Sequence, residues 1–169
     1  MDKNEIIQKL EEFIPAEFLV SDEKECQAAS ADRFRRFETI HGVYTQPTPA
    51  VIIKAQSTEQ VSQVLVFANQ NNLNVVPRTG RTATEGGLET RVQNSLVLDG
   101  SGMNKVLKID PFNMQATVQC GVVLGDLEQQ LRKQGLTTGH SPQSQPLAQF
   151  GGLLATRSIG QFSTLYGGI

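Results

Sequence analysis

The sequence predicts an α+β fold in which a small parallel β-α-β subdomain precedes a mixed or antiparallel α+β subdomain. Two patterns predict it. Residues 51–76 read as strand, helix and strand, and residues 106–119 read as two strands joined by a turn. A helical crossover joins parallel strands, whereas a tight turn joins antiparallel ones, so the two parts differ in strand direction.

The composition is that of an ordinary globular protein, with 38% hydrophobic residues, 19% charged residues and a net charge of −2 over 169 residues. Lys and Arg are not concentrated in any segment, so we expect no nucleic-acid partner. No apolar run is long enough to span a membrane, and the first residues lack the apolar core of a signal peptide. We therefore expect a cytoplasmic protein.

The two cysteines are far apart in the sequence. Cys26 and Cys120 form no CxxC pair and have no metal-like spacing to a histidine. A disulfide framework or a zinc site is therefore not expected, and both residues are interpreted as reduced structural thiols. We expect no metal.

The N-terminal part is predicted to be a helical lead-in. Apolar residues recur at helical spacing across residues 3–14, and Pro15 then ends the pattern. The proline-containing stretch 46–49 marks a boundary. We therefore expect two parts, residues 1–48 and residues 49–169.

The next region predicts a β-α-β unit. The apolar run at residues 51–53 is typical of a strand that is buried on both faces. Ser57 and Gln60 form a capping-box pattern that starts a helix, and residues 73–76 predict a second, parallel strand. A third strand is expected at residues 95–98. The helix places these apolar residues on one face: Val61, Val64, Leu65 and Ala68.

The second part begins with a predicted hairpin. Its strands are residues 106–109 and 115–119, and residues 110–113 supply the turn. Apolar residues on one face then predict a helix over residues 122–134, which Gly135 closes. The last 30 residues are rich in Gly, Ser, Thr and Gln and carry few periodic signals.

The loop after residue 76 has the residue types of a phosphate site. It reads Pro-Arg-Thr-Gly-Arg-Thr-Ala over residues 77–83. Successive backbone N–H groups in such a loop can surround an anion, and Gly80 allows a close approach. Arg78 and Arg81 could add charge-assisted hydrogen bonds. The loop is neither a Walker A motif nor a GxGxxG turn that opens a helix, so from the residues alone a plain glycine-containing loop remains an alternative.

A second candidate lies near the C-terminal end of the chain. Residues 138–144 and 156–158, with the glycine pair 151–152, are small and polar and could line a groove for a long ligand. Ordinary turn chemistry explains the same residues nearly as well. His140 is as compatible with a ligand contact as with a structural role, whereas His41 is interpreted as structural or surface-exposed.

Four motifs follow one another in a distinctive order. The loop at 77–83 is similar to Pro-x-Gly-Gly-Gly-Thr-Ser, and a Gly-Gly pair follows at 86–87. Residues 98–104 are similar to Leu-Asp-x-Ser-x-Met-Asn, and residues 151–156 to Gly-Gly-x-x-Ala/Ser-Thr. Residues 50–169 therefore resemble the FAD-binding domain of the vanillyl-alcohol oxidase type, also called the PCMH type.

Within that group, two segments look most like alkyldihydroxyacetonephosphate synthase and its bacterial relatives. They are residues 138–144 and 155–158, the latter followed by Tyr166 and Gly167. The lead-in at residues 32–34 looks similar to the same branch. The resemblance implies a PCMH-type FAD-binding fold, with FAD as the partner and its pyrophosphate on the first loop.

The resemblance also implies the residues that hold the cofactor. They lie in the first loop, in the segment after His140 and around the second glycine motif. The predicted FAD-binding residues are Pro77, Arg78, Thr79, Gly80, Arg81, Thr82, Ala83, Gln143, Ser144, Gly151, Gly152, Thr156, Arg157, Ser158 and Ile159.

Several residues depart from the family pattern. Thr79 and Arg81 stand where the family prefers glycine, Ala83 where it prefers serine, and residues 148–149 where Ser or Thr is usual. Fewer glycines restrict the backbone around a diphosphate, and side-chain donors are lost. Arg81 could compensate by pairing with a phosphate oxygen.

Relatives that tether the flavin from this region use a His in the first loop or a Cys before the second glycine motif. Thr82 and residues 147–148 occupy those places here. We therefore expect FAD to bind non-covalently.

The resemblance implies that the parent is an FAD-dependent oxidoreductase that acts on a small-molecule 2-hydroxy acid such as glycolate or D-lactate. Two alternatives remain: an alkyldihydroxyacetonephosphate synthase-like transferase, and a degenerate domain that has lost FAD, suggested by Thr79, Arg81 and Ala83. In the family, later strands and a substrate domain complete the site. We therefore expect the fold to be truncated after Ile169, the catalytic residues to lie beyond it, and the fragment alone to be inactive.

Overall fold

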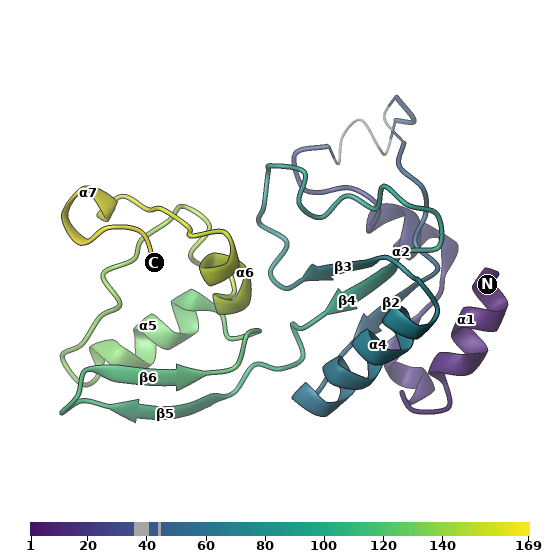
Figure 1. The fold of residues 1–169 in the computed structure, drawn as a ribbon. Helices are drawn as coiled ribbons and strands as arrows, with labels where there is room; N and C mark the ends of the chain where they lie inside the picture. The colour runs from purple at the N-terminus through teal and green to yellow at the C-terminus, as the bar shows by residue number, and fades with distance from the viewer. Residues whose placement is uncertain (36–40, 44) are drawn as a thin grey trace. The chain divides into compact units, whose positions relative to one another are not determined.

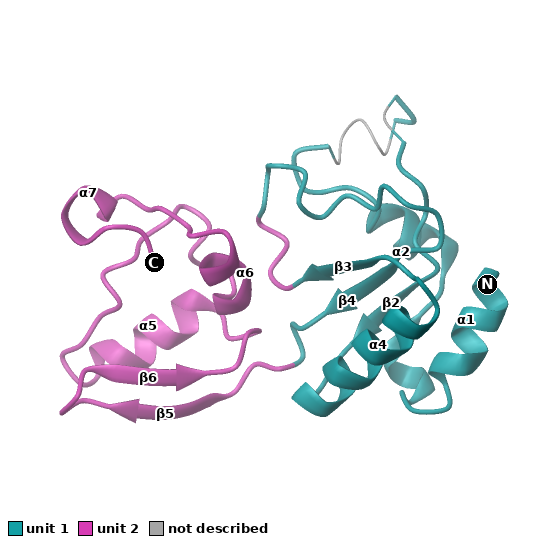
Figure 2. Ribbon diagram, viewed as in Figure 1, with its two compact units in different colours: residues 1–78, 83–102 teal, residues 79–82, 103–169 magenta. Residues whose placement is uncertain are grey.

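The computed structural model describes residues 1–35, 41–43 and 45–169, and these residues form two compact units (Figures 1 and 2). Unit 1 contains Met1–Arg78 and Ala83–Gly102, and unit 2 contains Thr79–Thr82 and Met103–Ile169. Unit 1 contains both the lead-in and the strands that follow residue 48, where the sequence suggested a boundary.

Unit 1 is built on a sheet with the strand order β1-β2-β4-β3. Its strands are β1 (Leu19–Val20), β2 (Val51–Lys54), β3 (Val75–Arg78) and β4 (Leu96–Asp99). β2 and β3 each pair in parallel with β4, while β1 pairs antiparallel with β2. The parallel directions are as predicted, but β2 and β3 are not neighbours, because β4 lies between them.

Burial explains why these segments form strands. Val51 and Ile53 are 0% exposed and Ile52 is 3% exposed, so both faces of β2 are covered. On one face, Ile52 and Val97 pack with Cys26 and other residues of a small apolar cluster. β3 begins two residues later than predicted and continues through Pro77 and Arg78.

Two helices of unit 1 follow their sequence signals. α4 (Thr58–Gln70) begins as predicted, because the Ser57 side chain accepts a hydrogen bond from Gln60 N. Gln60 Oε1 in turn accepts from Gln56 N at 2.7 Å, one residue before the expected partner. α1 (Lys3–Leu10) is shorter than the predicted helix, since the chain turns before Pro15.

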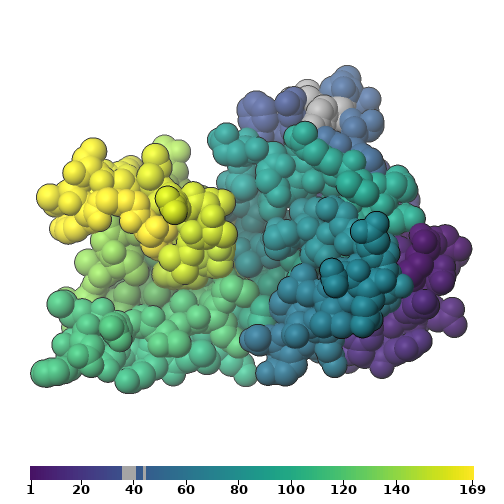
Figure 3. Space-filling view, viewed as in Figure 1, coloured from purple at the N-terminus to yellow at the C-terminus, as the bar shows by residue number. Residues whose placement is uncertain are grey.

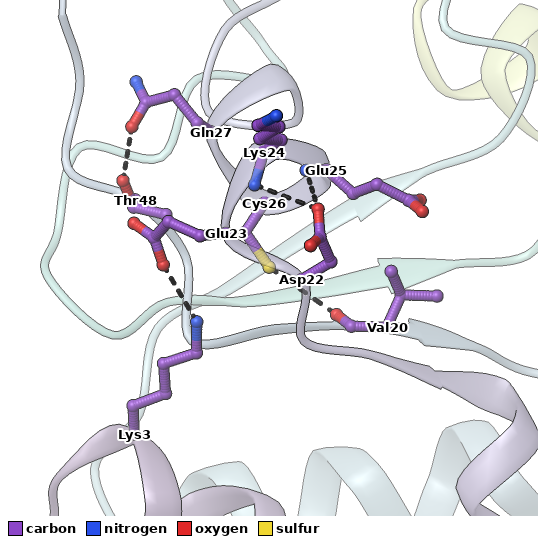
Figure 4. Close-up of polar contacts among 9 residues, drawn as sticks. All are labelled: Lys3, Val20, Asp22, Glu23, Lys24, Glu25, Cys26, Gln27 and Thr48. Carbon is purple, nitrogen blue, oxygen red and sulfur yellow. Dashed lines mark hydrogen bonds and ion pairs between the residues drawn. The ribbon is translucent and has the colours of Figure 1, made fainter.

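A short helix in the lead-in is tied down at several points (Figure 4). It is α2 (Glu23–Ala28), and it follows the 3₁₀ turn η1 (Ala16–Phe18). Asp22 caps α2, and Lys3 of α1 pairs with Glu23 at 3.1 Å. Cys26 donates its thiol to the carbonyl of Val20, and burial raises the pKa of this thiol. Neither Cys26 nor Cys120 forms a disulfide in the described part of the chain.

Unit 2 contains the predicted hairpin and helix. The antiparallel strands are β5 (Val106–Asp110) and β6 (Gln115–Val118), and the helix is α5 (Leu124–Arg132). Two further helices, α6 (Phe150–Ala155) and α7 (Ser163–Tyr166), lie in the last 30 residues, where few periodic signals were found. The core consists of Val122, Leu124, Leu127, Leu131, Ala148, Phe150 and Leu153.

Candidate functional site

The loop that follows β3 leaves its backbone donors unused. Within the part of the chain that the structure describes, no backbone N–H group of residues 79–83 donates a hydrogen bond to another protein group. The loop is half-buried or exposed along its length. A run of undonated N–H groups is what a phosphate-binding loop requires, because an anion can accept from several of them at once.

Gly80 fixes this loop against another segment of unit 2. A Cβ atom on Gly80 would lie 2.5 Å from the carbonyl oxygen of Leu147 and 3.0 Å from the nitrogen of Gln149. No side chain fits at that distance, so the loop can lie against the backbone of residues 147–149 only with glycine at this position. The residue type that suggested a close approach to phosphate therefore also has a packing role.

Arg81 adopts the backbone conformation of a glycine. Its φ is +53°, in the left-handed region, and its side chain is exposed. The resemblance places this residue where the family prefers glycine, and a left-handed backbone is the conformation that glycine adopts without steric cost. Thr79, the other position where the family prefers glycine, does not have a positive φ.

Arg78 has a partner inside unit 1. Its Nε donates to Asp99 Oδ2 at 2.9 Å, and both side chains are 7% exposed. The two residues are paired in register at the ends of β3 and β4, and Asp99 Oδ1 also accepts from Ser101 N. At least one donor of Arg78 is therefore committed to the sheet. Pro77 and Ala83, like Arg78, belong to unit 1.

The glycine pair of α6 packs against Thr79, the first residue of the loop. A Cβ on Gly151 would lie 2.7 Å from Cys120 Cβ and 3.3 Å from Thr79 Cγ2. A Cβ on Gly152 would lie 3.1 Å from Thr79 Oγ1. The structure thus brings together Thr79, Gly80, Gly151 and Gly152, which the sequence predicted for one site although Gly80 and Gly151 lie 71 positions apart.

The other predicted segments also meet within unit 2. A Cβ on Gly160 would lie 2.6 Å from the carbonyl carbon of Ser141, and Gln161 N donates to Ser141 O at 2.9 Å. These contacts place the segment that contains Gln143 and Ser144 beside the one that follows Ile159. Gln143 and Ile159 are exposed and Ser144 is half-buried.

Residues 156–159 follow α6 directly. Thr156 donates its backbone N–H and its hydroxyl to Gly152 O, and Ser158 N donates to Leu153 O. Arg157 has a φ of +47° and is exposed. The helix end therefore fixes the backbone of this segment by hydrogen bonds, unlike the loop at 79–83.

His140 is buried beside this segment. Its side chain is 6% exposed, and its Nε2 lies 3.2 Å from Ser158 Oγ. Burial lowers the pKa of His140, because the charged imidazolium is poorly solvated there. The ring therefore stays neutral near pH 7 and can act as a donor or an acceptor toward Ser158.

Two buried polar residues of this region were not predicted from the sequence. Glu128 on α5 is 3% exposed and accepts hydrogen bonds from Thr137 and Thr138. Its position, four residues after Leu124 on the apolar face of the helix, was a usable signal. Gln149 Oε1 is buried without a partner among the described residues, and no sequence signal indicates this.

Among the described residues, no helix is long and apolar enough to cross a membrane. The described part of the chain also holds no cluster of at least three His, Cys, Asp or Glu residues that could bind a metal ion.

Comparison with known proteins identifies the family. The FAD binding domain family matches residues 49–169. The chain belongs to the FAD-binding domain family. The uncharacterised FAD-linked oxidoreductase YgcU of Escherichia coli is 62% identical to this FAD-binding domain chain over 164 residues, which are 97% of the chain and 34% of that relative. The D-lactate dehydrogenase of Anaerostipes hadrus is 33% identical over 163 residues, or 96% of the chain and 32% of that relative.

Solved structures agree on the fold. A structure of alkyldihydroxyacetonephosphate synthase matches the whole chain with a TM-score of 0.88 and 29% identity, and the match covers 35% of that protein. A structure of p-cresol methylhydroxylase matches 93% of the chain with a TM-score of 0.76, and at 21% identity this shows the fold alone. The predicted PCMH-type FAD-binding fold is confirmed. The chain spans about a third of the length of the curated relatives it matches.

Proposed function

We propose that residues 79–83 hold the pyrophosphate of a non-covalently bound FAD, and that this chain is the cofactor-binding portion of a flavin-dependent oxidoreductase. The observation that carries the proposal is the set of undonated N–H groups at 79–83, on a loop that Gly80 packs against residues 147–149. Arg81 adds an exposed positive charge to the same loop. This donor set fits a diphosphate, which offers only acceptors.

FAD supplies the redox chemistry when bound, and the protein supplies binding and orientation. In this chain, Gly80 holds the loop in place and Arg81 offsets phosphate charge. Residues 156–159, with Gln143 and Ser144, extend the proposed contact along the cofactor. The positions where relatives carry a tethering His or Cys hold Thr82 and residues 147–148, which supports non-covalent binding.

We propose a 2-hydroxy acid of the glycolate or D-lactate type as the substrate of the parent protein. The support is the 33% identity to a D-lactate dehydrogenase over nearly the whole chain. A transferase of the alkyldihydroxyacetonephosphate synthase type is the second candidate, because that structure matches all 169 residues with a TM-score of 0.88.

Flavin content tests the first part of the proposal. The protein as its gene encodes it is purified, and its visible absorbance is followed through gel filtration. We expect flavin to co-migrate with the protein and to appear in the supernatant after acid precipitation. A colourless protein that FAD does not reconstitute would refute FAD binding, and flavin that stays in the acid pellet would refute non-covalent binding.

Reduction of the flavin by a 2-hydroxy acid separates the two candidate activities. The flavoprotein is mixed anaerobically with D-lactate, L-lactate or glycolate, and bleaching of the flavin absorbance is recorded. We expect bleaching by D-lactate or glycolate. If none of these acids bleaches the flavin, the 2-hydroxy-acid proposal fails and the transferase remains as the candidate activity.

A further inference from the structure

Glu128 is a buried carboxylate with an unusually complete set of donors. Its Oε1 accepts from Thr138 N at 2.7 Å and from Thr138 Oγ1 at 2.6 Å, and its Oε2 accepts from Thr137 Oγ1 at 2.9 Å. Arg132 Nε lies 3.5 Å from Oε2, one helical turn away on α5. Burial raises the pKa of Glu128, but the hydrogen bonds from Thr138 and Thr137 lower it by more, so the net pKa lies below its usual value. The carboxylate therefore stays ionised.

An ionised Glu128 fixes the direction of the next hydrogen bond. The Thr138 hydroxyl has one proton, and it donates that proton to Glu128. Its lone pairs remain, and one accepts from the backbone N–H of His140 at 3.2 Å. The carboxylate of α5 thus orders the backbone on which the His140 side chain is carried.

His140 in turn determines where the Ser158 hydroxyl points. Ser158 Oγ lies 3.2 Å from His140 Nε2, and within the described residues it has no other hydrogen-bonding partner. The backbone of Ser158 is held separately, through Leu153 O and Ile169 N. Loss of the histidine contact would therefore free the hydroxyl without releasing the backbone.

We infer that Glu128 is a positioning residue for the FAD site, and that it acts through Thr138 and His140 to orient Ser158. This inference rests on the proposed function, since it takes residues 156–159 to lie along the cofactor. Glu128 itself need not touch FAD. A purely structural role, in which Glu128 only ties α5 to residues 137–138, predicts a change in stability but no change in cofactor affinity.

The test measures the dissociation constant of FAD in the protein as encoded by its gene. We expect Glu128→Gln, Thr138→Val and Ser158→Ala each to raise it about tenfold, because each would weaken or remove one hydrogen bond from the Ser158 hydroxyl to the charged cofactor. Thr138→Ser keeps the hydroxyl and is expected to bind within about twofold of the wild type. Because the residues act in series, Glu128→Gln combined with Ser158→Ala should be no weaker than Ser158→Ala alone.

Leu127→Val is the matched control, since Leu127 lies beside Glu128 on α5 and is 1% exposed. It should lower the melting temperature and leave the dissociation constant unchanged. The inference is overturned if Glu128→Gln and Thr138→Val behave like Leu127→Val, or if the double variant shows additive losses. If Glu128→Gln does not fold, the Thr138→Val and Thr138→Ser pair decides the question. If the wild-type protein binds no FAD, the proposed function is refuted as well. If the wild type binds FAD and the variants have the same dissociation constant, only the role of Glu128 is refuted.

Discussion

The last residue of β3 and the loop that follows it satisfy their polar groups in opposite ways. Arg78 is 7% exposed at its side chain, donates to Asp99 and accepts from Gly100 N through its carbonyl. From residue 79 to residue 83, no backbone N–H donates within the described part of the chain. The change occurs between adjacent residues.

The difference shows that two neighbouring segments are held in different ways. Hydrogen bonds hold the end of β3, and close packing holds the loop that follows it. A strand end can be fixed by its ladder and a buried ion pair, because its polar groups have protein partners. The loop keeps its donors available and depends on close packing at Gly80. A binding loop needs this arrangement, since donors already used by the protein cannot serve a ligand. The two arginines that the sequence suggested as equivalent phosphate ligands are therefore not equivalent.

Breaking the buried ion pair by removing its arginine alone should give the largest effect. We expect Arg78→Met to lower the free energy of unfolding by about 3 kcal/mol, because it leaves the buried Asp99 carboxylate without its charged partner. Urea unfolding measures the change. The double variant Arg78→Met/Asp99→Leu should recover most of the lost free energy of unfolding. If the double variant also binds FAD as tightly as the wild type, Arg78 has no direct role in binding phosphate. A single variant as stable as the wild type would contradict the ion-pair argument.

Filling the space at Gly80 should have the next largest effect. Gly80→Val places atoms against Leu147 O, so we expect unfolding to become easier by about 1–3 kcal/mol and FAD to bind at least about tenfold more weakly. The domain should stay folded, since its whole stability is about 5–15 kcal/mol. Thermal unfolding and flavin titration give the two numbers. Gly87→Val is the control, because a Cβ there meets nothing within 4 Å, and equal effects at both glycines would show that the phosphate loop is misplaced.

Acid should weaken unit 2 in two steps, through residues outside the loop. The folded pKa of His140 is lowered from its usual value of about 6.5, so its contribution to stability is full above that pH and falls as the pH drops below it. Glu128 also has a lowered pKa, so its contribution is present above about pH 4.3 and is lost as the pH falls through the folded pKa. Melting temperatures from pH 8 to pH 3 follow both steps. His140→Asn should flatten the upper step only and Glu128→Gln the lower step only, and an unchanged upper step in His140→Asn would contradict this assignment.

Arg81 should give the smallest effect on stability. Arg81→Gly removes a side chain from a left-handed position but makes the unfolded chain more flexible, so the two changes should nearly cancel, within about 1 kcal/mol. FAD should bind a few-fold more weakly, and its affinity should depend less on salt, because one exposed charge is lost. Titrations at low and high ionic strength measure this. An unaltered salt dependence would mean that Arg81 does not approach the phosphates.

Local sequence signals predicted most of the fold. Three consecutive apolar residues at 51–53 predicted β2, and Ser57 with Gln60 predicted the start of α4. β1 is only two residues long and so has no readable periodicity. The position of β4 between β2 and β3 depends on tertiary packing, to which the order of elements along the chain gives no guide.

The site was predictable only in part. The resemblance located Gly80 and the Gly151–Gly152 pair. It did not show that the pair lies in a helix, because glycine has a low helix propensity and the sequence of α6 therefore gives no helical signal. The Arg78–Asp99 pair joins residues 21 positions apart, and no local pattern indicates such a contact. The positive φ of Arg81 was not predicted, although the resemblance marked this position as one where the family prefers glycine.

The lead-in supplies partners to residues that follow the start of the family match at residue 49. Asp32, which is 2% exposed, accepts from Gly86 N, and the fully buried Thr90 donates to Ser30 O and Pro47 O. The N-terminal residues, purple in Figure 3, include α1. Its Ile6 and Leu10 are completely buried. A gene fusion or domain exchange that begins at residue 49 would therefore carry the cofactor motifs without part of the framework that shapes their surroundings. The compact unit that carries these contacts therefore begins before residue 49, where the family match starts.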